Sequence, residues 1–143
     1  MRKNFGSKPM LYPMPVFIIA TYAEDGTPSA MNAAWGGMAD THLISICLGE
    51  HKTTRNIFAR KAFTVSMADA ENVVAADFVG IVSGDKVPDK LARAGWHTTK
   101  SEFVDAPLLT SFPWHWNVNS SAMTKKRACS SERSSMSVPR NGS

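Results

Sequence analysis

The segment 51–56, His-Lys-Thr-Thr-Arg-Asn, gathers several groups that bind anions. Lys52 carries a positive charge, Thr53 and Thr54 carry hydroxyl donors, and the residues after them read as a short helix over 55–61. Because a helix N-terminus presents N–H groups at the positive end of its dipole, the segment predicts an anion site suited to a phosphate. A helix with a threonine N-cap and a solvated lysine explains the same residues.

A second segment, 29–37, consists mostly of small residues and carries one amide and one indole. Small side chains at Ala33 and Ala34 let the backbone of a strand approach another group closely. The amide of Asn32 would then contact a flat heterocycle, and the Trp35 indole would pack beside it. The alternative is that the small residues serve tight packing between strands.

The usual catalytic patterns are missing from the sequence. There is no GxSxG, no HExxH, no Walker loop and no GxGxxG, so a Rossmann dinucleotide site is unsupported. Cys47 and Cys129 lie far apart, and neither belongs to a CxxC pair or stands near a histidine at metal-ligand spacing. We therefore expect reduced thiols, with neither a disulfide nor a metal site.

Hydrophobic patterning and turn residues predict the elements that position these segments. Asp25-Gly26 is a strong turn signal between two strands, which predicts a β-hairpin. Strands are expected over 16–22, 28–38, 42–48 and 63–67. Helices are expected over 55–61, over 69–78 with Asp69 as a cap, and over 86–94 with Gly95 closing the last.

Length and composition predict a single soluble domain. The chain has 143 residues with 43% hydrophobic content, which can build one core and hardly two. No run reaches the roughly 18 apolar residues that cross a bilayer. The N-terminal residues do not form a signal peptide either, so a cytoplasmic protein is expected.

The net charge of +4 is carried by one end of the chain. Residues 1–109 hold 11 basic and 11 acidic side chains, whereas residues 110–143 hold 5 basic side chains and one acidic, Glu132. A basic, serine-rich end is typical of a solvated, disordered tail and less often of an arm that grips phosphates. Because its basic residues do not follow a predicted element, nucleic-acid binding is disfavoured.

Five blocks of the sequence, in their order and spacing, resemble one known family. They are Met14 to Thr21, Asn32 to Gly36, His51 to Ile57, Phe63 to Met67 and Val79 to Gly84. Over residues 1–109 the chain is similar to the flavin-reductase-like, flavoredoxin-type family of FMN-binding split barrels. The resemblance implies a mainly β fold with helices, of the α+β class, built as a split β-barrel.

The resemblance also implies roles for the two segments described above. The strand that contains 29–35 would line the isoalloxazine of FMN, and the helix start after His51 would hold the phosphate. The cofactor-binding residues so implied are Asn32, Ala33, Ala34, Trp35, Lys52, Thr53, Thr54 and Asn56, with Ser83 from a further block near the cofactor. Neither a metal site nor a catalytic side chain is implied.

The activity that the resemblance implies is hydride chemistry carried out by the cofactor. Reduced nicotinamide, NADH or NADPH, would give hydride to FMN, and the electrons would pass to free flavin, oxygen or a protein acceptor. The protein would supply position and polarity, so His51 and His97 need no catalytic role. An alternative keeps the fold as a flavin-binding electron carrier or sensor without a nicotinamide reaction. The resemblance further implies a homodimer with the flavin near the subunit interface.

The likeness stops near Leu109, after which the sequence no longer reads like a barrel. The run Pro113-Trp-His-Trp-Asn uses amino acids with few codons, and reading those codons one base back gives an apolar residue, Ala, Leu and Glu. We therefore expect residues 110–143 to be an out-of-frame continuation that is largely disordered, with the barrel incomplete at its C-terminal end. No strand is expected around Trp114 and Trp116.

Overall fold

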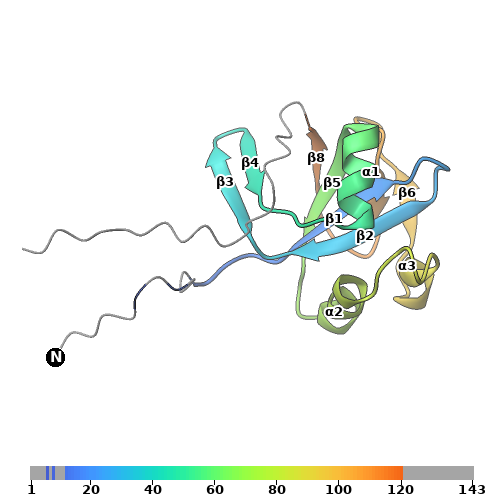
Figure 1. Cartoon of the computed structure of the whole chain (residues 1–143), viewed down its shortest axis with the longest axis horizontal. Coiled ribbons are helices and arrows are strands. Elements are labelled where there is room, and N and C mark those ends of the chain that lie inside the picture. The colour runs from blue at the N-terminus through green and yellow to red at the C-terminus, as the bar shows by residue number, and fades with distance from the viewer. Residues whose placement is uncertain (1–5, 7, 9–11, 121–143) are drawn as a thin grey trace, which may run out of the picture.

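The computed structural model describes residues 6, 8 and 12–120 of the chain. The strands are β1 (Phe17–Tyr22), β2 (Pro28–Ala33), β3 (Gly36–Asp40), β4 (Leu43–Ile46), β5 (Ala62–Met67), β6 (Thr98–Lys100), β7 (Pro107–Leu109) and β8 (Trp116–Asn119). The helices are α1 (Lys52–Arg60), α2 (Val73–Ile81) and α3 (Lys90–Arg93). An antiparallel sheet has the order β2-β1-β5-β8, and β3–β4 and β6–β7 form two further antiparallel pairs (Figure 1).

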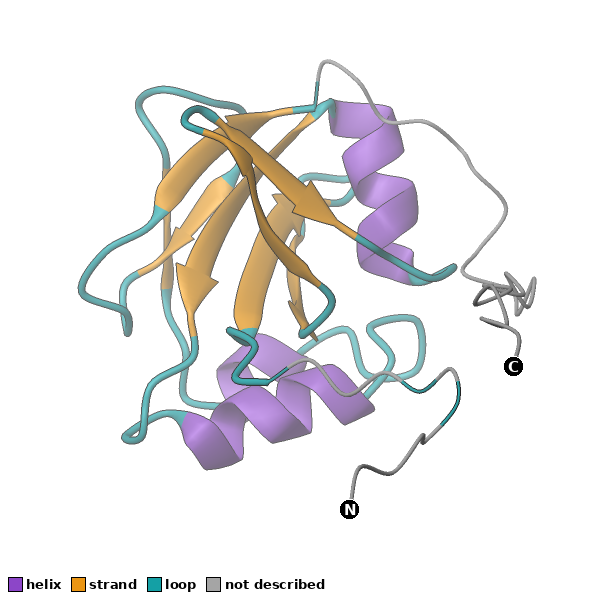
Figure 2. Ribbon diagram, turned by 90° about the vertical axis from the view of Figure 1, so that its left-hand side faces the viewer, coloured by secondary structure: helices purple, strands orange, loops and turns teal. Residues whose placement is uncertain are grey.

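The central strand β1 is buried on both faces. Phe17 and Ile19 belong to a core cluster with Ile57 of α1, whereas Ile18 belongs to a second cluster with Val79 of α2. Because successive strand residues face opposite sides of a sheet, a shift by one residue would exchange the two clusters. The burial pattern therefore fixes the register of β1. Figure 2 shows the helices on two different sides of the strands.

The expected strand over 28–38 is two strands in the structure. β2 ends at Ala33, and β3 starts after a break and pairs with β4, so that the β3–β4 hairpin extends away from the four-stranded sheet (Figure 1). A Cβ at Gly36 would lie 2.8 Å from the Ser45 carbonyl oxygen and 2.9 Å from the Phe17 ring. Glycine is required there because the β4 backbone and the Phe17 ring leave no room for a side chain.

Helix α1 begins three residues earlier than the expected 55–61, and its N-cap is His51 instead of a threonine. Thr53 and Thr54 are buried within the first turn. At the other end, Lys61 adopts a left-handed conformation with φ +58°, and its N–H donates to the Ile57 carbonyl. This backbone arrangement terminates the helix.

Helix α2 covers 73–81, whereas the sequence predicted a helix over 69–78. Asp69 Oδ1 accepts hydrogen bonds from the Asn72 backbone N–H at 2.8 Å and from Asn72 Nδ2 at 2.9 Å. These bonds hold 69–72 in a turn, because short polar side chains compete with the helix for backbone partners. Asp69 therefore precedes the helix by a turn, and Asn72 is the N-cap residue.

Helix α3 is shorter than the expected 86–94. The Ser83 carbonyl accepts hydrogen bonds from the N–H groups of Lys86 and Val87, which places these residues in a turn before the helix. Gly95 has φ +73° and follows α3, as the C-terminal glycine signal predicted. Among the described helices, none has the length and apolar character needed to cross a bilayer.

A strand forms after residue 109, which corrects the expectation of no strand around the two tryptophans. β8 pairs antiparallel with β5, with Trp116 opposite Val65. The Trp116 ring meets Phe17 edge to face at 6.4 Å between centroids, and Trp114 meets Trp116 at 4.7 Å. Edge-to-face aromatic pairs and ladder bonds both stabilise this segment at the sheet edge. The remainder of the expected tail, 121–143, lies outside the described residues, as does Cys129.

Candidate anion-binding site

The structure brings the starts of the two sequence-predicted segments together. Ser29 of β2 pairs with Thr21 of β1, so Ser29 faces the same side of the sheet as Ile19 and the helix α1. Its Oγ lies 3.5 Å from Thr53 Oγ1, and both residues are buried. Two hydroxyl groups from separate elements thus share one position at the start of α1.

The first turn of α1 is uncapped by side chains of the described residues. His51, the N-cap residue, has extended backbone with φ −129° and ψ 164°, and it makes no side-chain cap bond there. Thr54 Oγ1 donates instead to the Gly49 carbonyl at 2.8 Å. The N–H groups of the first turn therefore remain available to an anion at the positive end of the helix dipole.

Two lysines approach this helix start around Gly84. Lys52 Nζ donates to the Gly84 carbonyl at 3.2 Å. A Cβ at Gly84 would lie 3.2 Å from Lys52 Cδ, 3.4 Å from Ser29 Oγ and 3.7 Å from Lys90 Cε. Side chains from β2, α1 and α3 therefore converge on one glycine. We call Ser29, Lys52, Thr53, Gly84 and Lys90 the anion cluster.

Lys90 is a buried cation that the sequence patterns did not reveal. Its Nζ donates to the Val79 carbonyl at 2.9 Å and to the Val82 carbonyl at 3.0 Å, at the C-terminal end of α2. Burial, together with the charge of Lys52, lowers the pKa of Lys90 to about 8, against the opposing influence of Asp85. A single lysine carries no hydrophobic periodicity that would predict burial. Its position in the anion cluster follows from the packing of α3 against the end of α2.

Asn56 is a buried amide on the face of α1 that carries Thr53, three residues before it. Asn56 is 7% exposed, and its Nδ2 has no hydrogen-bond partner within the described part of the chain. An unsatisfied buried donor costs about 1–3 kcal/mol. A ligand oxygen at this position would remove that cost.

Asn32 faces the opposite side of the sheet from Ser29. Its Nδ2 donates to the Ala76 carbonyl of α2 at 3.3 Å. A Cβ at Gly80 would collide with the Asn32 amide, so the absence of a side chain at Gly80 lets α2 approach β2. The structure shows this amide holding a helix, and its contact with a heterocycle stays a prediction.

The other residues of the segment 29–37 lie toward the far end of β2 and beyond it. Ala33 is buried in the cluster of Phe17, whereas Ala34 is exposed and Trp35 is 55% exposed. The Trp35 carbonyl accepts a hydrogen bond from the Cys47 N–H at 2.7 Å, at the base of the β3–β4 hairpin. At about 3.3 Å per residue, Trp35 stands roughly 20 Å along the chain from Ser29.

Ser83 opens the turn that contains Gly84. Its side chain is exposed, and its Oγ accepts a hydrogen bond from the Asp85 N–H at 3.3 Å. Ser83 therefore shapes the backbone beside the anion cluster. Whether its hydroxyl contacts a cofactor stays a prediction.

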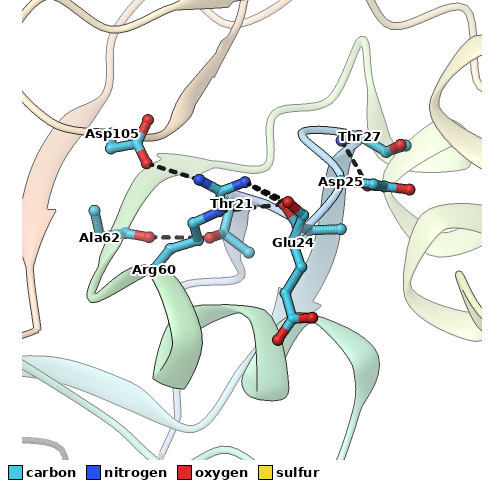
Figure 3. Close-up of polar contacts among 8 residues, drawn as sticks. Thr21, Glu24, Asp25, Thr27, Arg60, Ala62 and Asp105 are labelled. Carbon is cyan, nitrogen blue, oxygen red and sulfur yellow. Dashed lines mark hydrogen bonds and ion pairs between the residues drawn. The ribbon is translucent and has the colours of Figure 1, made fainter.

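Arg60 fixes the C-terminal end of α1 against the β1–β2 turn. Its Nε and Nη2 donate to the Ala23 carbonyl at 3.2 and 2.7 Å, and Nη2 also donates to the Glu24 carbonyl at 3.0 Å. Nη1 pairs with Asp105 at 3.2 Å, as Figure 3 shows. Arg60 and Thr53 lie at opposite ends of α1, so the helix joins this anchor to the cluster at its start.

The structure thus combines antiparallel sheets with a cluster of hydroxyl groups and two lysines at a helix start. Residues 10–116 match the flavin reductase like domain family. The chain belongs to this family, and the expected α+β split-barrel fold is confirmed. The match continues into the first residue of β8, beyond the point near Leu109 where the resemblance was expected to stop.

Solved structures agree with this assignment. Flavoredoxin of Desulfovibrio vulgaris (Miyazaki F) is 36% identical, with a TM-score of 0.78, over 83% of this chain and 66% of flavoredoxin. An FMN-binding domain of a flavin reductases-like enzyme from Shewanella baltica OS155 is 18% identical, with a TM-score of 0.68, over 73% of this chain and 56% of the other. The 2-nitrobenzoate 2-nitroreductase of Pseudomonas fluorescens is 21% identical, with a TM-score of 0.68, over 77% and 55%.

These matches cover only part of the solved chains. The chain spans about two thirds of flavoredoxin and a little over half of the other two chains. At 18% and 21% identity, the latter two structures support the fold alone. No curated protein matches the chain.

Proposed function

We propose that this chain binds FMN, with the phosphate at the start of α1. The observation that supports this most strongly is the convergence of the anion cluster on an uncapped helix start, next to the unpartnered Asn56 amide. Lys52, Thr53 and the first-turn N–H groups are all donors, as a phosphate requires. Thr54 would contribute through its backbone, since its hydroxyl bonds Gly49.

The ring of the flavin would lie along β2, toward Asn32, Ala33, Ala34 and Trp35. The support is geometric: the small residues stand at one end of the strand and the anion cluster at the other. A ligand with an anionic group at one end and a flat ring at the other matches this separation. Backbone N–H groups near the ring would stabilise negative charge on a reduced flavin.

The proposed activity is that of a flavin-reductase-type oxidoreductase. Bound FMN would supply the capacity to accept hydride from NADH or NADPH and to pass electrons to flavin or another acceptor. The residues of this chain would bind and orient the cofactor. None of them is assigned a proton transfer, since the anion cluster contains donors that position and neutralise a phosphate.

Two ligands that differ by one phosphate test the binding site. FMN and riboflavin should be titrated against the wild type and the K52A/T53A variant, with flavin fluorescence as the measurement. We expect the variant to lose affinity for FMN far more than for riboflavin. Lys100→Ala, an exposed lysine on β6, is the matched control. Equal losses for both ligands would contradict the assignment of the phosphate site.

A separate experiment distinguishes a reductase from an electron carrier or sensor. NADH and NADPH are mixed with the FMN-loaded protein in a stopped-flow instrument, and the flavin absorbance near the visible maximum is followed. A reductase loses this absorbance on mixing, because its flavin is reduced. A carrier or sensor without a nicotinamide reaction remains yellow with both nucleotides.

The proposed assembly is a homodimer that covers the β3–β4 hairpin. Trp35, Met38 and Leu43, on and beside this hairpin, are 55%, 64% and 60% exposed. Within the described residues, β3 and β4 form a two-stranded sheet of their own. A second copy of the chain would bury these apolar side chains. Light scattering should report twice the chain mass for the wild type and a shift toward monomer for M38E/L43E.

We also propose that 110–143 is an out-of-frame continuation of the family sequence. The family match ends at residue 116, close to the run of tryptophan and histidine that suggests the shift. β8 would then pair with the sheet edge, with Trp116 against Phe17, without selection for that position. The nucleotide sequence around codon 110 tests this: restoring one base should give a continuation that resembles the family.

A further inference from the structure

Helix α1 holds two successive residues of the turn that follows α2. Lys52 Nζ bonds the Gly84 carbonyl at 3.2 Å, and Arg55 Nη2 forms an ion pair with Asp85 Oδ2 at 2.7 Å. Lys52 and Arg55 are three residues apart and therefore lie on one side of the helix. The turn 83–85, which we call the strap, is thus tied to the first turn of α1 by one backbone contact and one side-chain pair.

The strap supplies one member of the anion cluster, Gly84. Gly84 is buried, and a Cβ there would lie within 4 Å of the side chains of Lys52, Ser29 and Lys90. Within the turn, the Ser83 carbonyl accepts bonds from Lys86 and Val87. These internal bonds make the strap a compact unit. A ligand anion at Ser29 and Thr53 would therefore lie next to the strap.

The Arg55–Asp85 ion pair is weak enough to open and close reversibly. The two side chains are 60% and 50% exposed, and exposed ion pairs contribute little and weaken as salt increases. The Arg93–Asp89 pair has similar exposure, at 61% and 57%, and a distance of 2.9 Å. It joins two residues one helical turn apart at α3, whereas Arg55–Asp85 joins two separate elements.

We propose that Arg55 and Asp85 form a latch that holds the strap, with Gly84, against the other members of the anion cluster and thereby sets how fast an anionic ligand leaves. The inference rests on the proposed function, which makes that ligand FMN. Arg55 and Asp85 are positioning residues: they act through Gly84 and need not contact the phosphate. Loss of either residue opens the latch, so both losses change the release rate in the same direction.

Release kinetics of FMN test the latch against a simple effect of charge. Full-length wild type, Arg55→Gln, Asp85→Asn, the charge swap R55D/D85R and the control Asp89→Asn are loaded with FMN, and release is followed by fluorescence after dilution at pH 7. We expect both single variants to release FMN about two- to fivefold faster at low salt, as loss of an exposed pair allows. The swap should restore the wild-type rate, and Asp89→Asn should leave it unchanged.

A charge effect alone gives a different pattern. Removing Asp85 makes the site more positive and should slow release of an anion, whereas removing Arg55 should accelerate it. Opposite signs for the two variants would overturn the latch, as would rates equal to the wild type. If the wild type itself fails to bind FMN in the preceding titration, the proposed function fails, and that result is recognised before any release rate is compared.

A ligand-independent measurement adds a second requirement. In the protein without flavin, the amides of Lys86 and Val87 should exchange hydrogen faster in Arg55→Gln and Asp85→Asn than in the wild type, because an unlatched strap opens more often. The same amides should be unchanged in Asp89→Asn. Equal exchange in all variants would also overturn the latch, whatever the release rates.

Discussion

Ser29 Oγ on β2 lies 3.5 Å from Thr53 Oγ1 on α1, although 24 residues separate them in the sequence. The contact places a strand and a helix start within reach of one ligand group. Neither hydroxyl is exposed, so both would be costly to leave without a partner. A phosphate oxygen between them would accept from both.

Thr53→Val should weaken FMN binding by roughly 10- to 150-fold, because a hydrogen bond to a charged group contributes about 1.5–3 kcal/mol. Valine keeps the shape of threonine and removes the donor. Riboflavin affinity should change little. Calorimetric titration of both ligands provides the measurement, and Thr99→Val on β6, an exposed threonine, provides the control. A variant with wild-type FMN affinity would remove Thr53 from the site.

FMN affinity should fall as the pH rises through about 8. Burial lowers the pKa of Lys90 to about 8, and a bound dianion would raise the pKa again, so binding takes up a proton above this pH. Linkage of one proton lowers the affinity by at most about tenfold per pH unit. Titrations from pH 7 to 10 should show this slope for FMN and none for riboflavin. A shared slope would assign the titration to another group.

Gly80→Ala should destabilise the fold by roughly 1–3 kcal/mol, because the added methyl group overlaps the Asn32 amide and forces α2 away from β2. Urea denaturation measures the loss. Gly37→Ala is the matched control, since a Cβ there meets no atom of the described residues within 4 Å. Asn32→Ala in the Gly80→Ala background should recover part of the loss. Additive losses in the double variant would place the strain elsewhere.

Arg60→Met should cost about 1–3 kcal/mol of folding free energy, because methionine keeps much of the apolar stem and loses the bonds to two carbonyls and to Asp105. Arg93→Met removes an exposed pair on α3 and should cost less than about 1 kcal/mol. Chemical denaturation of both variants gives the comparison. Similar small losses would mean that the network in Figure 3 does not anchor α1.

The sequence patterns located the elements well wherever burial and turn chemistry agreed. The apolar run of β1 and the Asp25-Gly26 turn gave the first hairpin, and His51–Asn56 gave the helix start of α1. The predicted ends of elements were wrong where a side chain competed for backbone hydrogen bonds or where the chain changed its strand partner. Asp69 holds a turn ahead of α2, and Gly36 starts a new strand because β3 turns toward β4.

The candidate site was predicted in part. Thr53 and Asn56 are three residues apart on a helix, so their spacing alone indicates a shared face. Lys90 comes from another helix, and only the packing of α3 against the end of α2 brings it to the cluster. β8 was not predicted for a similar reason, because it pairs with a strand about 50 residues earlier in the sequence, and Trp116 meets the Phe17 ring, also far away in the sequence.

If the chain binds FMN at the start of α1 as proposed, the uncapped helix start and the unpartnered Asn56 amide would couple the amount of folded protein to the supply of that ligand. A ligand present at about 100 times its dissociation constant stabilises the folded state by roughly 2.7 kcal/mol, a large share of a typical folding margin. In a flavin-starved cell, more of the chain would therefore be unfolded at any moment and exposed to proteases.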